Sequence, residues 1–243
     1  MQKSSLSDKI IAITRGGGVF TQLYVKKEVN RMIFGLPKEN LHVNISIDEY
    51  ERYLALQDRR LYLTSEIKNS EDESEGVYMS KVNQIVDDII SYNRQDDKSK
   101  GKTRKPIRLY INSPGGSVQE GYSLVSAIEL SKTPVYTINI GTWGSMAFLI
   151  GITGHKRFSL PYMRFMMHDG WDGDFNSLNK VQDRMEFTKR FEKEVVEKHV
   201  LKYSKMTAKE YSKLLRVDYY MLPEDALQHG FIDEIVTDVS TIL

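Results

Sequence analysis

The chain has no cysteine among its 243 residues. Disulfide bonds, thiolate catalysis and cysteine metal sites are therefore all excluded, and the absence fits a reducing compartment. A large net charge is missing as well, because 34 Lys and Arg residues are balanced by 33 Asp and Glu residues. Nucleic-acid-binding proteins usually carry a clustered basic surface, so we expect no nucleic acid partner.

Long apolar runs are also absent. The N-terminus has only the short run Ile10 to Ile13, which is too short for the core of a signal peptide. No other stretch approaches the roughly 20 apolar residues that a membrane span needs. We therefore expect a cytoplasmic protein that has no membrane partner. With 40% hydrophobic and 28% charged residues, the composition is that of a globular chain able to form one well-packed domain.

The pattern of the sequence changes near residue 57. Residues 1–57 mix short apolar pieces with turn residues and show no clear period, so we assign them to a divergent N-terminal segment and residues 58–243 to the main domain. Within that domain, the charged stretch 95–106 lacks apolar residues and is expected to be a mobile surface loop. After Pro106, strands alternate with helices, which predicts parallel pairing and an α/β fold of layered sheets and flanking helices. The expected ranges are strands at 107–112, 135–141, 156–160 and 164–169, and helices at 118–131, 145–154 and 207–215.

A long helix is expected from Ser177 to Tyr203. Its apolar residues are sparse among many charged ones, and its amphipathic face is poorly covered by the rest of the predicted domain. A helix of this kind buries its apolar face against a neighbour. We therefore expect it to pack on something beyond its own domain.

Ser145 is the strongest candidate for a nucleophile. In the stretch INIGTWGSMAFLIG, a strand turns through Gly141 and Gly144 into a helix that begins at the serine. Unpaired N–H groups and the helix dipole at such an N-terminus stabilise an oxyanion. The alternative is that Ser145 only caps the helix.

His168 follows an apolar strand, where an imidazole can act as general base for a serine at the same sheet edge. A carboxylate is needed to orient it, and Asp218 is attractive because it lies between apolar residues, where an unpaired charge is costly. Asp169 and Asp172 are alternatives from a polar turn. The order Ser, His, Asp differs from that of hydrolases with a G-x-S-x-G elbow. The remaining histidines lie in polar or helical contexts with no nucleophile beside them: His42, His155, His199 and His229.

The glycine pair in RLYINSPGGSV follows a strand directly. Glycine readily adopts positive φ and leaves its N–H unshielded, so Gly116 and Met146 are predicted to donate the two N–H groups of an oxyanion hole. The alternatives are a simple tight turn and a phosphate-binding loop, although SPGGSV matches neither common phosphate motif. The scattered histidines and carboxylates show no metal-ligand spacing, so no metal is expected.

Four motifs resemble the ClpP family, the proteolytic subunit of the Clp protease. They are LYINSPGG, the segment from Gly141 to Met146, RFMMH, and DYYMLPEDALQHGFID, and the resemblance covers roughly Arg60 to Val236. It implies the ClpP/crotonase fold, with the long helix as a protruding handle.

The resemblance further implies a serine endopeptidase with Ser145 as nucleophile, His168 as base and Asp218 as its orienting acid. Gly116 and Met146 fall at the family's oxyanion amides, and the substrate is expected to lie extended beside residues 116–118, which are Gly116, Ser117 and Val118. The implied partners are further copies of the chain in heptameric rings stacked into a tetradecamer, unfolded polypeptides, and an ATP-dependent unfoldase of the Clp type. That partner uses the ATP, so no cofactor is expected here.

Two other functions remain open at this point. One is a catalytically weak ring subunit with an assembly or regulatory role. The other is a crotonase-like acyl-CoA enzyme, which needs an oxyanion hole but no triad. The sequence also departs from the family at Trp143-Gly144 and Asp169-Gly170, in the insertion at 95–106, and in the N-terminal segment, which corresponds to the axial, partner-facing region. We expect Trp143 to reshape the substrate channel.

Overall fold

The computed structural model describes residues 10–15, 21–25, 47–68, 80–99, 103–170, 177–214 and 217–243. It divides into two compact units, Met1–Asp58 and Arg59–Leu243. In the first unit, β1 (Ile10–Arg15) pairs antiparallel with β2 (Thr21–Val25). The helix α2 (Ile47–Gln57) carries two carboxylates in its first turn, where the helix dipole favours negative charge.

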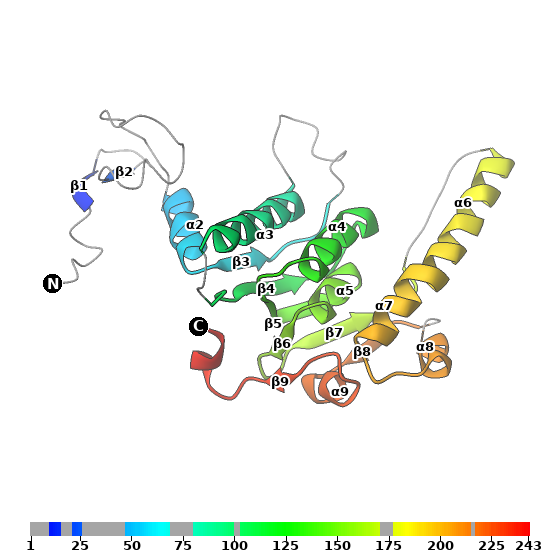
Figure 1. Ribbon diagram of the computed structural model, residues 1–243. Coiled ribbons are helices and arrows are strands. Elements are labelled where there is room, and N and C mark those ends of the chain that lie inside the picture. Colours follow the sequence, from blue (N-terminus) through cyan, green and yellow to red (C-terminus); the bar gives the residue numbers. More distant parts are fainter. Residues whose placement is uncertain are drawn as a thin grey trace. The chain divides into compact units, whose positions relative to one another are not determined.

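The second unit is built on a seven-stranded sheet (Figure 1). Its main path is β3-β4-β5-β6-β9, and every pair along it is parallel. β7 adds to β5 in parallel, and β8 pairs antiparallel with β7. The predicted α/β fold with parallel pairing is confirmed. The strands are β3 (Arg60–Leu63), β4 (Ile107–Ser113), β5 (Val135–Gly144), β6 (Lys156–Ser159), β7 (Arg164–Met167), β8 (Tyr219–Met221) and β9 (Glu234–Ile235).

Three helices cover one face of this sheet, α3 (Lys81–Lys98), α4 (Val118–Glu129) and α5 (Met146–Ile152), and they pack beside one another in that order (Figure 1). α3 begins after Ser80, whose hydroxyl accepts a hydrogen bond from the N–H of Asn83 at 3.2 Å. Five of the seven residues of β4 are buried, as expected for a parallel strand inside a covered sheet.

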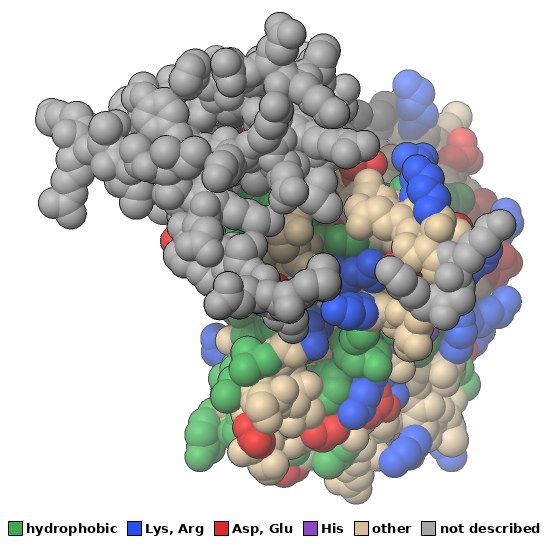
Figure 2. Space-filling model, turned by 60° about the vertical axis from the view of Figure 1, so that its left-hand side comes forward, with side chains coloured by type: hydrophobic (Ala, Val, Ile, Leu, Met, Phe, Trp, Pro, Cys, Tyr) green, Lys and Arg blue, Asp and Glu red, His purple; other side chains and the backbone are tan. Residues whose placement is uncertain are grey.

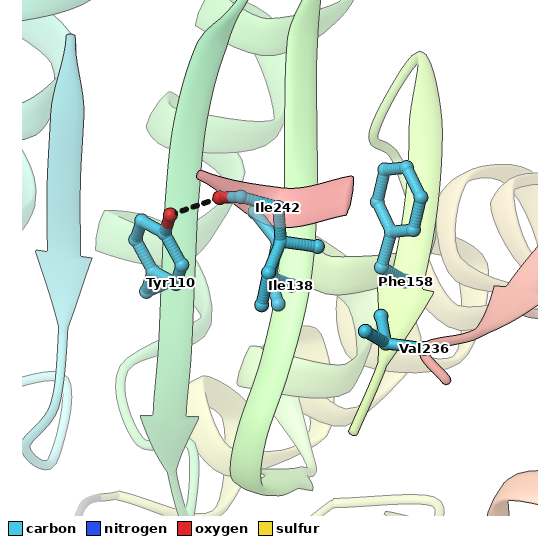
Figure 3. Packing of buried hydrophobic residues seen from close by; sticks show 5 residues of the cluster. All are labelled: Tyr110, Ile138, Phe158, Val236 and Ile242. Carbon is cyan, nitrogen blue, oxygen red and sulfur yellow. Dashed lines mark hydrogen bonds between the residues drawn. The ribbon is translucent and has the colours of Figure 1, made fainter. Parts of the chain in front are cut away.

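An apolar cluster lies where the C-terminal segment packs back onto the sheet (Figure 3). Tyr110, Ile138 and Phe158 come from three neighbouring strands, and Ile242 comes from the short 3-10 helix η4 (Val239–Ile242). The Tyr110 hydroxyl donates a hydrogen bond to the carbonyl oxygen of Ile242. This contact anchors the end of the chain to β4.

The predicted long helix is present, with one irregularity. α6 (Leu178–Phe191) continues into the π-helical segment η3 (Glu192–Val196) and then into α7 (Glu197–Lys202). α6 has no buried residue, and Figure 1 shows it extending away from the sheet. α8 (Ala208–Leu214) and α9 (Pro223–Gln228) follow. No helix among the described residues is long and apolar enough to cross a membrane.

The prediction of a mobile loop at 95–106 is wrong for residues 95–98, which belong to α3, whereas residues 103–106 lie outside helices and strands. α3 continues to Lys98, and the Asp96 carboxylate accepts hydrogen bonds from Arg59 at 2.6 and 2.8 Å. These bonds hold the pKa of Asp96 below its usual value. Arg104 pairs with Asp97 and donates to the Thr133 hydroxyl. Asp97 and Arg104 are thus paired with each other within the stretch, and Asp96 is paired with a distant partner, Arg59. Residues 100–102 lie outside the described part.

The surface of the described residues carries both signs of charge. On the face drawn in Figure 2, Lys and Arg side chains are spread among Asp, Glu and apolar side chains. This mixture agrees with the formal net charge of +1.

Candidate active site

Ser145 occupies the junction between β5 and α5. Its backbone has φ 51° and ψ −122°, a combination that residues with a side chain rarely adopt and that often marks a functional site. The Ser145 hydroxyl makes no capping hydrogen bond to α5, so the interpretation of Ser145 as a mere helix cap is wrong. The strained turn leaves the hydroxyl available for another partner.

That partner is His168, which follows the last residue of β7. Its Nε2 lies 2.7 Å from the Ser145 Oγ, and its side chain is 18% exposed. β5 and β7 are parallel neighbours, and the Ser145 N–H donates to the Met166 carbonyl at 2.9 Å. The hydroxyl and the imidazole therefore meet because both follow the carboxyl ends of paired strands. A hydroxyl held by an imidazole in this way is the arrangement used for nucleophilic catalysis.

Asp218 approaches the other side of the imidazole. It directly precedes β8, whose Tyr219 faces Met167 of β7, and its Oδ1 lies 3.8 Å from the His168 Nδ1. This separation is within ion-pair range but longer than a hydrogen bond. The side chain of Asp218 is 59% exposed, and Val217 is exposed as well. The argument that burial would make an unpaired Asp218 costly is therefore wrong.

The alternative carboxylates and the other histidines have different surroundings. Asp169 is exposed, and within the described part no hydrogen bond or ion pair joins it to His168. Burial raises the pKa of Glu192 on η3, and the negative charge of Asp169 acts in the same direction. Asp172 and His42 lie outside the described residues. The remaining three histidines have hydrogen-bond partners away from Ser145: His155 with the Val135 N–H, His199 with Thr153 and His229 with Tyr219.

The glycine pair lies against the Ser145 junction. A Cβ on Gly115 would come within 2.8 Å of the Ser145 Cβ and 2.9 Å of the Met146 nitrogen. The φ values of Gly115 and Gly116 are 102° and 134°, which residues with side chains rarely adopt. Only a chain without a Cβ at position 115 can pass this close to the serine.

Gly116 is held by a short parallel bridge to Ile67. The Ile67 N–H donates to the Gly115 carbonyl, and the Ser117 N–H donates to the Ile67 carbonyl, each at 2.8 Å. In a parallel bridge of this pattern, the residue between the two hydrogen-bonded neighbours, here Gly116, directs its own N–H and C=O away from the partner strand. The N–H of Gly116 therefore points to the side opposite Ile67.

Met146 and Ser117 differ in what their N–H groups do. Met146 is the first residue of α5, where an N–H has no partner within the helix. The Ser117 N–H is bonded to Ile67, and the Ser117 hydroxyl accepts from the Glu120 N–H at 3.4 Å to cap α4. Among the predicted substrate contacts, the N–H groups of Gly116 and Met146 remain suited to stabilise an oxyanion. The N–H and the hydroxyl of Ser117 instead form hydrogen bonds within the fold.

The comparison with known proteins agrees with this architecture. The sequence model of the Clp protease family matches residues 48–239. The chain belongs to the Clp protease family. It is 32% identical over 195 residues to the ATP-dependent Clp protease proteolytic subunit of Streptococcus mutans. It is 30% identical over 194 residues to the same subunit of Streptococcus suis. Both matches cover 79% of this chain and 90% of the relative.

Membership of the Clp protease family confirms the predicted ClpP/crotonase fold. The family match begins at residue 48, inside α2, and so includes residues that precede the division between the two compact units at Asp58. Among the described residues, no group of three or more His, Asp or Glu side chains could hold a metal ion.

Trp143 does not have the position that we expected for it in this Clp protease. It is fully buried and packs edge-on against Phe165 at a centroid distance of 5.4 Å. A Cβ on Gly151 would lie 2.4 Å from the indole ring. The indole therefore fills the core between β5 and α5, and the prediction that it reshapes a substrate channel is wrong.

Sequence reasoning missed two residues that shape this site. Ile67 orients Gly116, but it is an ordinary apolar residue far upstream in the sequence and gives no local signal. Asn139 is fully buried beside the site. The sequence did contain a signal for Asn139, because an amide in the middle of the apolar strand VYTINIG needs hydrogen-bond partners.

Proposed function

We propose that this chain is a serine endopeptidase subunit of a self-compartmentalising Clp protease. It would hydrolyse peptide bonds of unfolded polypeptides that an ATP-dependent unfoldase delivers. The observation that carries the proposal is the 2.7 Å separation of the Ser145 Oγ and the His168 Nε2 at the N-terminus of α5, in a chain of the Clp protease family.

In the proposed reaction, the Ser145 Oγ attacks the scissile carbonyl carbon while the His168 Nε2 accepts the hydroxyl proton. The resulting oxyanion accepts hydrogen bonds from the N–H groups of Gly116 and Met146, which stabilise the transition state. His168 then donates its proton to the leaving amine, and water releases the acyl group by the reverse sequence. Asp218 orients the imidazole and stabilises its charged form.

Asp218 must move for this role. Its Oδ1 is 3.8 Å from the His168 Nδ1, so a hydrogen bond requires closure by about 1 Å. Catalytic hydrogen bonds are often long in structures without substrate. Asp218 directly precedes β8, and its side chain is 59% exposed. We propose that bound substrate or assembly of the ring closes this gap.

The substrate would bind as an extended strand. Gly116 directs its N–H and C=O away from Ile67, and Val118 beside it is 47% exposed. An added strand is held mainly through its main chain and therefore shows little side-chain selectivity. This suits an enzyme that acts on many unfolded polypeptides.

Assembly into stacked heptameric rings is supported by α6. No residue of α6 is buried, and Leu178, Met185 and Phe187 are 82%, 53% and 62% exposed. A short helix without tertiary packing is marginally stable in water, so we propose that a second copy covers these side chains. The Streptococcus relatives are named as proteolytic subunits of an ATP-dependent Clp protease. On that basis we propose a Clp-type unfoldase as the partner that uses ATP, and no cofactor for this chain.

A catalytically weak ring subunit is a second candidate, favoured by the exposure of Asp218 and its distance from His168. A fluorophosphonate probe distinguishes the two, because it reacts only with an activated serine. We expect labelling of the wild type, no labelling of Ser145→Ala, and cleavage of fluorogenic peptides by the wild type alone. Intact rings without labelling or peptide cleavage would overturn the peptidase and support the assembly role. An acyl-CoA enzyme would likewise not depend on Ser145.

A further inference from the structure

Asn139 is a fully buried amide in β5. Its Oδ1 accepts a hydrogen bond from the Gly141 N–H at 3.0 Å, and its Nδ2 donates to the Arg164 carbonyl at 3.0 Å. A backbone N–H can only donate and a carbonyl can only accept, so the two partners determine the orientation of the amide. One side chain thus connects the middle of β5 to the first residue of β7.

The amide lies where β5 exchanges one neighbour for another. Residues 136–139 pair with β6, whereas residues 142–144 pair with β7. On the side of β4, Ile111 faces Asn139 but Ser113 faces Trp143, so β5 holds two more residues than β4 over this step. Such a bulge bends a strand and redirects the side chains that follow it.

Asn112 supports the same bulge from β4. Its Oδ1 accepts a hydrogen bond from the Thr142 N–H at 3.0 Å, and a Cβ on Gly141 would lie 2.2 Å from that oxygen. Two asparagine side chains therefore replace the ladder hydrogen bonds that the bulge removes. Only Asn139 reaches across to β7.

The two backbone partners of Asn139 occupy equivalent places in the site. Gly141 precedes Ser145 by four residues, and Arg164 precedes His168 by four residues. Between these points β5 and β7 are paired in parallel. The amide therefore ties together the two strand segments that carry the hydroxyl and the imidazole.

We propose that Asn139 is a positioning residue that sets the separation of the Ser145 Oγ and the His168 Nε2. The proposal rests on the proposed function, because this separation matters for catalysis only if the two groups act as nucleophile and base. A general base must lie within about 2.6–3.2 Å of the group that it deprotonates. A misplacement of about 1 Å can lower the rate on the order of 10²-fold.

The substitution Asn139→Asp tests the connection to β7. The new side chain has nearly the same shape and still accepts from the Gly141 N–H, but a carboxylate cannot donate to the Arg164 carbonyl. We expect kcat for a fluorogenic peptide to fall by about 10- to 100-fold with KM unchanged. The rate of Ser145 labelling by the fluorophosphonate should fall by a similar factor. Asn139→Leu, which is of similar size and uncharged, serves as a second variant because a buried carboxylate can prevent folding.

Asn93→Asp is the matched control. Asn93 on α3 has the same kind of bonding, because its Nδ2 donates to the Ile89 carbonyl at 2.9 Å and its Oδ1 accepts from the Lys132 N–H at 2.9 Å. None of these partners belongs to β5 or β7. This variant should lose stability but keep the wild-type kcat per folded subunit.

Crystal structures of the wild type and both Asn139 variants provide a readout independent of activity. We expect the separation of the Ser145 Oγ and the His168 Nε2 to exceed hydrogen-bond length in the variants only. An unchanged separation together with kcat within twofold of wild type would overturn the positioning role, and so would an equal loss of kcat in Asn93→Asp. A wild type that does not react with the probe would overturn the proposed function, while the measured separations would still decide the role of Asn139.

Discussion

The segment from β5 to α5 and the helix α6 differ in how much of each a single subunit buries. In the first, Trp143, Ala147 and Phe148 are fully buried, and the buried Thr137 hydroxyl donates to the Gly151 carbonyl at 2.7 Å. In α6 no residue is buried. The first segment therefore has its shape determined within one chain, whereas we propose that the second is stabilised by packing against another copy.

The first region holds the candidate active site, and the second is the surface that we propose for assembly. Ser145, His168 and the glycine pair are held by strands and helices of one subunit, so their geometry does not require a neighbouring copy. Asp218 is intermediate, because it is exposed and lies too far from His168 for a hydrogen bond. We infer that it is the member of the site most sensitive to what surrounds the subunit.

The largest expected effect is on activity. Ser145→Ala and His168→Ala should each lower peptide hydrolysis on the order of 10³-fold or more, because the two groups act as a unit. For the same reason the double variant should be no worse than the worse single variant. Steady-state cleavage of a fluorogenic peptide measures all three. Losses that multiply in the double variant would contradict the proposed unit.

The choice of orienting acid is tested by a pair of carboxylates. Asp218→Asn should lower hydrolysis by roughly 10²- to 10⁴-fold with the rings intact, because the imidazole is then held in the wrong tautomer. Asp169→Asn is the control and should have a much smaller effect. The opposite result in the same peptide assay would show that Asp169, which follows His168 directly, is the acid.

The next effect is on stability in the buried segment. Phe148 packs edge-on against Phe231 at a centroid distance of 4.8 Å, so Phe148→Ala should lower the free energy of unfolding by about 3–5 kcal/mol. Phe187→Ala on α6, where the ring is 62% exposed, should change it by no more than about 0.5 kcal/mol. Denaturation should be measured at several protein concentrations, since assembly makes the midpoint concentration-dependent. Equal losses would remove the contrast between the two regions.

A pH effect is expected from His199, where α7 packs on α5. Burial lowers the pKa of His199 to about 4 from 6.5. Between these values the unfolded chain binds a proton that the folded chain does not, so stability falls as the pH falls from about 6.5 towards 4. The total effect is at most about 3 kcal/mol. Urea denaturation at pH 7.5 and pH 5 should show a smaller pH dependence in His199→Leu, and an unchanged dependence would refute this assignment.

The smallest expected effect on subunit stability comes from the surface of α6, although its effect on assembly is large. Phe187→Glu should abolish ring stacking, because a carboxylate cannot be buried unpaired at an apolar interface, while changing subunit stability by less than about 0.5 kcal/mol. Lys189→Gln, which changes the charge by the same amount on the same helix, is the control. Native mass spectrometry reports the assemblies. Stacked rings in Phe187→Glu would show that this side chain is not at the interface.

The order of strands and helices could be predicted because it follows from local patterns. Residues such as Gly144 and Ser145 indicate a turn into a helix within a few positions. The apolar strands after Pro106 alternate with amphipathic helices. The candidate site could also be predicted from the sequence, for a related reason. Carboxyl ends of parallel strands meet at one sheet edge, so a serine and a histidine at such ends can be paired before any distance is known.

Predictions failed where a residue's environment depends on partners far away in the chain. Asp96 was assigned to a solvated loop, yet it is bonded to Arg59. Trp143 was assigned to a channel, yet it packs on Phe165 in the core. Asp218 was favoured because burial was expected, yet it is exposed. In each case the neighbouring sequence identified the type of side chain but not its exposure to solvent or the distant residues that contact it.

The sequence by itself therefore determined the α/β layering, the turn at Ser145 and the side chains available for its chemistry, since all of these depend on short-range periodicity and on residue type. The tertiary structure alone decided the 2.7 Å contact between Ser145 and His168, the 3.8 Å gap to Asp218, and the amide of Asn139 that spans the bulge of β5. These are distances of a few ångströms between segments remote in sequence. Strand register and packing set them, and no local pattern encodes either one.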